Sequence, residues 1–570
     1  MASRANVAGV GAIIRQDQIK LPLDWLSHWA TVAGSKPWLT ELTGGAITRD
    51  ITWAEAAGEA RRVAAYLRTK GWEPGSRIGI ISKNCPHWIL ADIAIWMAGY
   101  VSVPLYPTLP ADSVRQILEH SDSKACFIGK LDDWEQMKPG VPEDVHCISF
   151  PSSPPIDYAT WDNIVADTPP LQDWARGQHS DLCSIIYTSG TTGMPKGVMH
   201  SFETFAQAAE AAHGRVRFSQ DDRMLSYLPL SHVAERLAIE LGSIRGGSRI
   251  FFNGSLEAFA RDMQVARPTF FLSVPRLWLK FQQGVLQQIP AQELDRMLAL
   301  PEAAGAVRKK VLGGIGLDAC RFAIGGAAPM PPELLEWYQR LGLEIVEAYG
   351  MTENCGISHA NLPGQTRPGF VGAAYPGVAC RIAPDTGEVQ IQSPGNMLGY
   401  YNEPGITQAA FTSDGWLKTG DCGEINADGM LRITGRIKDI FKTSKGKYVA
   451  PAPIEDKLVM HPAVEACCVV GENSPQPFGL VMLSESILAR LTESGARQSL
   501  ANSLETHLSE INATLAPYEQ MDFLVVVGDQ WSTANGFLTP TFKIKRDRIE
   551  KAYGRDFDAW GRGKQRIIFG

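Results

Sequence analysis

A segment rich in glycine and hydroxyl residues constrains this chain more than any other feature. Three glycines, four hydroxyl residues and Lys196 fall within the ten residues 188–197. The apolar run from Cys183 to Ile186 precedes the segment and predicts a buried strand. Glycines let backbone N–H groups turn toward an anion, hydroxyls donate hydrogen bonds, and the lysine adds a mobile positive charge. The segment is therefore predicted to bind nucleotide phosphates, although an ordinary flexible loop is the alternative for this segment taken alone.

The loop does not follow the common GxxxxGK[ST] pattern, because Gly197 stands where that pattern needs a serine or threonine. It closely resembles the phosphate-binding signature of the adenylate-forming superfamily, which contains acyl-CoA synthetases, peptide-synthetase adenylation domains and beetle luciferases. Five further segments resemble motifs of that superfamily and occur in its order, namely Gly325 to Pro329, Tyr349 to Glu353, Gly415 to Asp421, Gly435 to Asp439 and Thr539 to Lys543.

The resemblance covers nearly the whole chain, from about Trp53 to the last predicted helix. Residues 227–236 and 267–278 resemble the corresponding segments of long-chain fatty acyl-CoA synthetases in particular. The chain is therefore identified as a member of the superfamily that is most similar to its long-chain acyl-CoA synthetases.

The alternation of strands and helices predicts an α/β protein. Thr52 and Glu55 form a capping-box pattern that opens a helix ending before Gly71. A strand at residues 77–82, a helix near residue 88 and a strand at residues 100–106 predict a βαβ unit with parallel pairing. The chain has 570 residues, enough for about three or four folding units.

Two domains are predicted. Residues 1–434 form a large N-terminal domain of stacked α/β subdomains, with a small, partly antiparallel β subdomain after Gly372. Residues 435–570 form a smaller α+β C-terminal domain, which the resemblance implies to be mobile.

Charge and cysteine content exclude several classes of function. The chain has 54 basic and 61 acidic residues, a net charge of −7, and shows no basic patch for nucleic acid. Its ten cysteines have no metal-binding or redox spacing, which favours a reduced, cytoplasmic compartment. The apolar window from Trp88 to Leu105 contains Asp92, Gly99 and Pro104, so a buried helix and strand are expected there instead of a membrane span. Peripheral contact with a membrane and formation of a homodimer stay open.

The resemblance implies a site that binds ATP and Mg²⁺. Activation of a carboxylate by ATP depends on positioning and electrostatics more than on covalent chemistry by the protein. Glu353 and Thr188 are the expected oxygen ligands of Mg²⁺, and Thr352 is expected to bond the α-phosphate. The expected β- and γ-phosphate loop comprises Thr188, Ser189, Gly190, Thr191, Thr192, Gly193 and Lys196.

The nucleoside is expected to lie against three further motifs. Gly325, Gly326 and Ala327 would allow close approach of the backbone to the adenine and the acyl chain, although such a segment is also typical of a tight turn. Tyr349, followed by Gly350 and Met351, would lie flat against the adenine, and a packed aromatic is its structural alternative. Asp421 would accept both ribose hydroxyls, with Arg436 on the other side of the ribose; a solvated turn aspartate is the alternative.

The resemblance assigns catalysis of adenylation to Lys543, whose ammonium would bridge the carboxylate and the α-phosphate. Phe542 precedes this lysine where the family commonly has glycine, and Lys545 is the rival assignment. His232 is expected near the phosphate and the incoming thiol, although a lone histidine is commonly structural. Lys438 is expected to be the hinge between the domains.

The predicted function is ATP-dependent activation of a medium- to long-chain fatty acid to its acyl-adenylate. Transfer to coenzyme A would follow, so that AMP and pyrophosphate are released. The alternatives are an acyl-AMP ligase that delivers to a carrier protein and a ligase for aryl or short-chain acids. A non-catalytic adenylate-binding protein is disfavoured, because Glu353, Asp421, Arg436 and Lys543 are all present.

Overall fold

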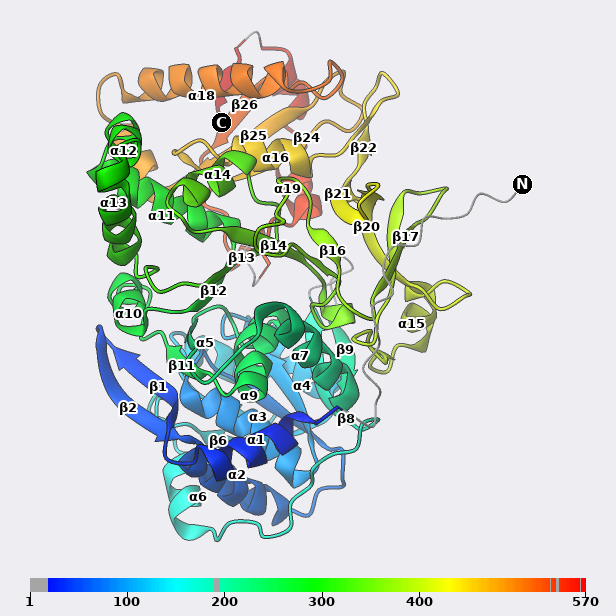
Figure 1. The fold of residues 1–570 in the computed structure, drawn as a ribbon. Coiled ribbons are helices and arrows are strands. Elements are labelled where there is room, and N and C mark those ends of the chain that lie inside the picture. Colours follow the sequence, from blue (N-terminus) through cyan, green and yellow to red (C-terminus); the bar gives the residue numbers. More distant parts are fainter. Residues whose placement is uncertain (1–18, 189–194, 534, 540–542, 564) are drawn as a thin grey trace.

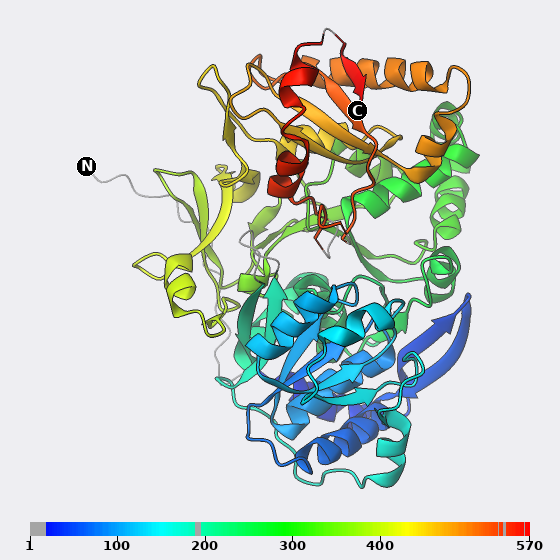
Figure 2. The same ribbon diagram turned by 180° about the vertical axis from the view of Figure 1, so that it is seen from behind.

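The computed structural model describes residues 19–188, 195–533, 535–539, 543–563 and 565–570 (Figure 1). In both views the C-terminal part of the chain lies on one end of a larger N-terminal part, and Figure 2 shows the same arrangement from behind. Strands and helices alternate along the chain, so the expected α/β class is confirmed.

A mainly parallel sheet forms one layer of the N-terminal part. Its strand order within the described residues is β19-β9-β8-β4-β3-β5-β6-β7. The predicted βαβ unit is present, because β3 and β4 pair in parallel and α3 connects them. The strands are β3 (Arg77–Ile81), β4 (Val101–Leu105), β5 (Ser123–Ile128), β6 (His146–Ser149), β7 (Ala159–Thr160), β8 (Leu182–Thr188), β9 (Lys196–Ser201) and β19 (Gly399–Tyr400).

A second, larger sheet collects strands from distant parts of the sequence. Its order is β17-β18-β20-β21-β16-β15-β14-β13-β12-β10-β11-β1-β2 in the described chain. The strands are β1 (Pro37–Thr43), β2 (Ala46–Thr52), β10 (Arg223–Ser226), β11 (Arg249–Phe252), β12 (Phe270–Ser273), β13 (Phe322–Gly326), β14 (Ile345–Tyr349), β15 (His359–Ala360), β16 (Gly372–Ala374), β17 (Ala379–Ile382), β18 (Glu388–Gln392), β20 (Leu417–Ile425) and β21 (Met430–Arg436).

The predicted β subdomain after Gly372 is antiparallel, since β17, β18, β20 and β21 pair in that way. It is also continuous with the larger sheet, because β16 pairs with both β15 and β21. Strand β21 runs through residues 435 and 436, so pairing continues slightly beyond residue 434. The division into 1–434 and 435–570 stays a prediction.

The helix α2 (Trp53–Arg68) begins at the predicted capping box and buries the predicted apolar stripe. Thr52 Oγ1 accepts the N–H of Glu55 at 3.3 Å, and a Glu55 carboxylate oxygen accepts the N–H of Thr52 at 2.8 Å. Both contacts give a hydrogen-bond acceptor to a backbone N–H group at the start of the helix, where these N–H groups have no partner within the helix. The expected apolar stripe is buried, namely Ala56, Ala60, Val63, Ala64 and Leu67.

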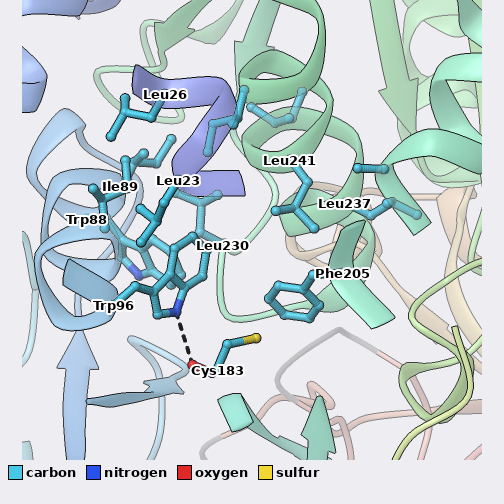
Figure 3. Packing of buried hydrophobic residues seen from close by; sticks show 14 of the residues in the cluster. Leu23, Leu26, Trp88, Ile89, Trp96, Cys183, Phe205, Leu230, Leu237 and Leu241 are labelled. Carbon is cyan, nitrogen blue, oxygen red and sulfur yellow. Dashed lines mark hydrogen bonds between the residues drawn. The ribbon is translucent and has the colours of Figure 1, made fainter. Parts of the chain in front are cut away.

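The helix α3 (Pro86–Ala98) is buried along its whole length, which explains its nearly uniform apolar sequence. It ends at Gly99, whose φ of 86° lies in the left-handed region that favours glycine. Trp88 and Trp96 of this helix pack near Leu23 and Leu230, and the Trp96 indole N–H donates to the Cys183 carbonyl at 3.0 Å (Figure 3). The expected buried helix and strand are confirmed, and no helix in the described ranges is long and apolar enough to cross a membrane.

The remaining helices cover the sheets and connect their strands (Figure 1). They are α1 (Pro22–Val32), α4 (Ala111–His120), α5 (Trp134–Met137), α6 (Trp161–Asp167), α7 (Phe202–Val216), α8 (Val233–Glu235), the π-helix η3 (Arg236–Leu241), α9 (Gly242–Gly246), α10 (Phe259–Ala266), α11 (Pro275–Gln288), α12 (Ala291–Leu298), α13 (Pro301–Gly314), α14 (Pro332–Arg340) and α15 (Pro404–Ala410), with the short 3-10 turns η2 (Lys138–Gly140) and η4 (Thr352–Asn354).

The C-terminal part contains its own sheet, in the order β24-β25-β26-β27. Helix α18 lies along the outer side of this sheet in Figure 1. The elements are β22 (Phe441–Lys442), β23 (Tyr448–Val449), α16 (Ala452–Leu458), β24 (Val464–Val470), β25 (Phe478–Leu483), α17 (Glu485–Arg490), α18 (Ala496–Ala513), β26 (Leu524–Val527), α19 (Arg546–Tyr553), α20 (Phe557–Gly561) and β27 (Ile567–Phe569).

Candidate active site

The predicted phosphate loop connects two antiparallel strands. The apolar run before it forms β8, as expected, and β8 pairs with β9 up to the last pair, Thr188 with Lys196. Ser189, Gly190, Thr191, Thr192 and Gly193 lie outside the described residues. The structure therefore places the two ends of the loop side by side, with the expected hydroxyl ligand and the expected phosphate-binding lysine on neighbouring strands.

The segment from Gly350 to Glu353 follows β14 and is held in a tight turn. A side-chain carbon on Gly350 would lie 2.3 Å from the Gly356 carbonyl oxygen, so this position requires glycine for packing. The Met351 N–H donates to Asn354 Oδ1 at 2.9 Å. His200 on β9 donates through Nε2 to the Thr352 carbonyl at 2.8 Å. This last contact ties the turn to the strand that leaves the phosphate loop.

Glu353 is fixed through both its backbone and its side chain. Its carbonyl accepts the Met397 N–H at 2.8 Å. Its Oε1 accepts the Tyr400 hydroxyl at 2.8 Å. Carboxylate and hydroxyl oxygens are the donors that Mg²⁺ prefers, so Glu353 and Thr188 suit the expected metal by their chemistry.

Three of the predicted nucleoside-binding residues meet in one hydrogen-bonded group. The Tyr349 hydroxyl donates to Asp421 Oδ2 at 2.6 Å, and Arg436 Nε donates to Asp421 Oδ1 at 2.9 Å. Asp421 and Arg436 are directly paired on β20 and β21. An ionised carboxylate has about four acceptor positions, so Asp421 can still accept further hydroxyls.

The segment from Gly325 to Ala327 ends β13 and enters an exposed loop. A side-chain carbon on Gly325 would lie 2.8 Å from Met330 Cγ, which gives this glycine a packing role as well. Gly326 pairs with Ala348, next to Tyr349. Ala327 has a φ of 68°, a conformation that costs a residue with a side chain about 1–2 kcal/mol. The loop is thus held close to Tyr349 in a strained conformation.

Lys543 reaches this group from the C-terminal part. Its side chain is solvent-accessible, yet surrounding protein groups remove much of its hydration, and this lowers its pKa. The Arg436 guanidinium lowers that pKa further, whereas the Asp421 carboxylate opposes the shift. The structure therefore brings Lys543 within electrostatic range of the Asp421–Arg436 pair, while its rival Lys545 is the N-cap residue of α19.

His232 lies close enough to Lys543 to respond to its charge. Burial, together with the Lys543 ammonium, lowers the pKa of His232 to about 4. Its Nδ1 accepts the Ala234 N–H at 3.2 Å, so the neutral ring carries its proton on Nε2. His232 is therefore a neutral hydrogen-bond donor at physiological pH, held at the start of α8. Lys438, the expected hinge, lies in the turn that follows β21.

Two residues near the site received no role from the sequence. Tyr400 contacts Glu353, as described above. Glu235 is only 1% exposed, and its Oε1 accepts hydrogen bonds from the Ser226 hydroxyl at 2.9 Å and the Tyr227 N–H at 3.0 Å. Burial raises the pKa of Glu235 to about 8. The sequence signal for Glu235 was a carboxylate in an apolar segment just after His232.

Comparison with known proteins identifies the family of this chain. Residues 26–401 match the family model described as AMP-binding enzyme, and residues 438–560 match the AMP-binding enzyme C-terminal domain. The chain belongs to the AMP-binding enzyme family. The expected membership in the adenylate-forming superfamily is thereby confirmed.

This AMP-binding enzyme is similar to long-chain acyl-CoA synthetases over most of its length. It is 29% identical to a long-chain-fatty-acid–CoA ligase of Mycobacterium bovis, covering 90% of this chain and 92% of the relative. It is 28% identical to a peroxisomal long-chain acyl-CoA synthetase of Arabidopsis thaliana, with 88% and 80% covered.

Solved structures of the same fold include the adenylation domain of a carboxylic acid reductase from Segniliparus rugosus, in complex with AMP and a co-purified carboxylic acid. That domain is 22% identical, with a TM-score of 0.77 and coverage of 97% of this chain and 96% of the other. An anthranilate CoA ligase in complex with anthranoyl-AMP is 21% identical, with a TM-score of 0.75 and coverage of 94% and 97%. The expected fold is therefore confirmed.

Proposed function

We propose that this AMP-binding enzyme activates a medium- to long-chain fatty acid with ATP and transfers the acyl group to coenzyme A. The enzyme class, an AMP-forming acyl-CoA synthetase, is confirmed by the family match and by the relatives. In the first step a carboxylate oxygen attacks the α-phosphorus of ATP and pyrophosphate leaves. In the second step the thiol of coenzyme A attacks the acyl carbon, the thioester forms and AMP leaves.

One observation carries the proposal: a lysine of the C-terminal part lies in the field of the Asp421–Arg436 pair, beside a neutral histidine. Asp421 and Arg436 would hold the ribose, and Tyr349 would lie against the adenine. The Lys543 ammonium would then stand where negative charge moves from the carboxylate to the phosphate, and a fixed cation stabilises such a transition state. Bound Mg²⁺ would offset charge on the phosphates, with Glu353 and Thr188 as its protein ligands.

The remaining predicted residues have supporting roles. The residues 188–196 would hold the β- and γ-phosphates, and Thr352 would bond the α-phosphate. The lowered pKa of His232 leaves an Nε2–H available to a phosphate or acyl oxygen. Residues 435–570 would move as a unit about Lys438, because Lys543 and the entering thiol cannot both occupy the space over one adenylate.

The choice of a fatty acid is supported by the relatives, which are fatty acyl-CoA ligases at about 29% identity. A carrier protein as acceptor, or an aryl or short-chain acid as substrate, is the second candidate. Two proteins of the same fold support this second candidate: an anthranilate CoA ligase and the A-PCP didomain of a carboxylic acid reductase.

A panel of carboxylic acids tests the proposal directly. Each acid, from acetate through C18 fatty acids to benzoate, is incubated with ATP and Mg²⁺, with and without coenzyme A. We expect AMP release that requires coenzyme A and is largest for acids of medium to long chain. Acid-dependent pyrophosphate release without any acyl-CoA would favour a carrier-protein acceptor, and a preference for benzoate or acetate would overturn the fatty-acid assignment.

A further inference from the structure

Tyr400 contacts two residues that the proposed function places on the triphosphate. Its hydroxyl donates to Glu353 Oε1 at 2.8 Å. The ammonium nitrogen of Lys196 lies over its ring, 5.1 Å from the ring centre. One side chain therefore contacts both the expected metal carboxylate and the expected phosphate-binding lysine, which come from segments about 150 residues apart in sequence.

The backbone fixes Tyr400 from two directions. Strand β19 pairs antiparallel with β9, and this places Tyr400 opposite Val198, two residues beyond Lys196. On the other side, the Tyr400 N–H donates to the Thr407 hydroxyl at 2.9 Å. Any side-chain carbon at the preceding Gly399 would lie 2.8 Å from Thr407 Cγ2, so only glycine permits this approach. Tyr400 is 8% exposed as a residue and packs with Val198, Met397 and Leu417.

Packing alone would be satisfied by phenylalanine, so the hydroxyl needs a separate explanation. A hydrogen bond to a carboxylate is about twice as strong as one between neutral groups, and it fixes the rotation of the carboxylate. The Tyr400 hydroxyl is the donor of this hydrogen bond, because an ionised carboxylate oxygen can only accept. This hydrogen bond engages Oε1 of Glu353 and does not involve Oε2.

The ring has a separate effect on Lys196. The face of an aromatic ring carries partial negative charge and attracts an ammonium group above it. This contact holds a flexible lysine near the last pair of β8 and β9, where the phosphate loop begins and ends. A lysine that is already oriented loses less conformational freedom when it binds a phosphate.

We propose that Tyr400 is a positioning residue that orients Glu353 toward the metal and Lys196 toward the terminal phosphates of ATP. The proposal rests on the proposed function, because it takes the metal and phosphate roles of these two residues from there. It predicts that Tyr400 matters for Mg·ATP and not for AMP, since AMP lacks the β- and γ-phosphates.

The test measures nucleotide binding without any acid, so that no reaction takes place. Dissociation constants for Mg·ATP and for AMP are measured by calorimetry on the wild-type protein, Tyr400→Phe and Tyr400→Leu. We expect Mg·ATP to bind about tenfold more weakly to Tyr400→Phe, the scale of one lost hydrogen bond to a charged group. Tyr400→Leu removes the ring as well and should bind Mg·ATP still more weakly, with AMP affinity unchanged in both variants.

The neighbouring Tyr401 provides a matched control. Its ring faces His120 and Arg77 instead of Glu353 and Lys196. Tyr401→Phe also loses one tyrosine hydroxyl and should bind Mg·ATP like the wild-type protein. Equal weakening by both substitutions, or equal weakening of AMP and Mg·ATP in Tyr400→Phe, would overturn the proposal in favour of a general effect on packing.

A double-mutant cycle tests whether Tyr400 acts through Glu353. If it does, Tyr400→Phe combined with Glu353→Gln should bind Mg·ATP no more weakly than Glu353→Gln alone. Additive losses would overturn this role, as would a Tyr400→Phe protein that melts at a lower temperature but binds Mg·ATP normally. These outcomes are independent of the acid panel: a protein that binds Mg·ATP but activates no acid would refute the proposed function and leave the result for Tyr400 intact.

Discussion

The N-terminal and C-terminal contributions to the site are held in place by different means. In the N-terminal part, site residues hydrogen-bond to one another, as in Tyr349–Asp421 at 2.6 Å and Tyr400–Glu353 at 2.8 Å. Lys543, by contrast, is fixed to its own segment through the backbone, where its N–H donates to Thr539 Oγ1 at 3.1 Å. Its ammonium interacts with the Arg436 guanidinium and the Asp421 carboxylate electrostatically. The proposed N-terminal site residues are thus already in contact with one another, whereas the proposed contribution of Lys543 would depend on where the C-terminal part lies.

The interface between the two parts combines attraction and repulsion. Arg276 of α11 forms an ion pair with Glu465 of β24, and the Lys280 ammonium is 4.0 Å from the same carboxylate. Elsewhere, burial and the Glu455 and Glu347 carboxylates raise the pKa of Asp456 to about 8. Glu347 belongs to β14 in the N-terminal part, and Asp456 to α16 in the C-terminal part. Under the proposed function, such a balance of opposing charges would suit a contact that forms and separates in each reaction cycle.

The strongest test of this difference is removal of the Lys543 ammonium. We expect Lys543→Ala to reduce acid-dependent pyrophosphate release by about 10²-fold or more, the scale of losing one preorganised electrostatic group. Thioester formation from supplied acyl-adenylate should persist, because the N-terminal site is intact. Lys545→Ala is the control and should keep most of the adenylation activity. Equal loss of both half-reactions in Lys543→Ala would show that this lysine is part of one static site.

A substitution at the predicted hinge should slow thioester formation while adenylation persists, the reverse of the effect expected for Lys543→Ala. Proline at residue 438 fixes φ and removes a backbone donor, so Lys438→Pro should hinder rotation about this turn. We expect acyl-adenylate to accumulate while the rate of acyl-CoA formation falls, by about tenfold if rotation becomes rate-limiting. Acyl-adenylate and acyl-CoA are measured in the same reaction, and Lys438→Ala serves as the control. Unchanged flux to acyl-CoA would place the pivot elsewhere.

Breaking the ion pair at the interface should have a smaller effect. Partly exposed ion pairs contribute up to about 1 kcal/mol, so Glu465→Gln should lower the adenylation rate by about two- to fivefold. The exposed Glu493, which lies in the same part of the chain, provides the control substitution Glu493→Gln. The exchanged pair, Arg276→Glu with Glu465→Arg, should restore part of the adenylation rate. If Glu465→Gln and Glu493→Gln behave alike, the ion pair has no role in the arrangement of the two parts.

A change within the N-terminal part should affect stability instead of the balance between half-reactions. Because the folded pKa of Glu235 is about 8, above its ordinary value of 4.5, its contribution to stability is complete below pH 4.5. That contribution is lost as the pH rises toward 8, by about 1.4 kcal/mol per pH unit. In Glu235→Gln this loss should disappear. Urea denaturation of both proteins at pH 5, 6.5 and 8 measures the difference, and parallel pH profiles would contradict the raised pKa.

Local sequence signals predicted the elements whose causes are local. The capping box at Thr52 and Glu55 and the apolar stripe behind it placed α2, and the breaks at Gly99 and Pro104 separated a buried helix from a strand. The first hairpin, β1 and β2, was not predicted although its Gly44-Gly45 turn is a local signal, and the pairing of β1 with β11 about 210 residues later has no local signal at all. Nothing in residues 37–52 identifies that partner.

The candidate site residues divide in the same way: those in sequence motifs were predicted, and those whose contacts depend on tertiary pairing were missed. Tyr349, Asp421 and Arg436 lie in motifs, and the structure brings all three together. Tyr400 lies in a segment to which no motif was assigned, and its contact with Glu353 exists because β19 joins the sheet of β9. Gly350 was expected to serve the nucleotide, yet the structure adds a steric requirement for glycine there, because a side-chain carbon would meet the Gly356 backbone, a contact that only tertiary packing creates.

The order of strands in the larger sheet has a consequence for biosynthesis. Leu39 of β1 pairs with Ile250 of β11, so among the described residues β1 has no parallel partner until more than 200 further residues have been made. At a synthesis rate of about 5–20 residues per second, that interval lasts roughly 10–40 s. During this time the hairpin β1–β2 presents unpaired strand edges, a feature that promotes association between nascent chains. The C-terminal sheet, whose strands all lie between residues 464 and 569, completes its pairing within one short stretch of translation.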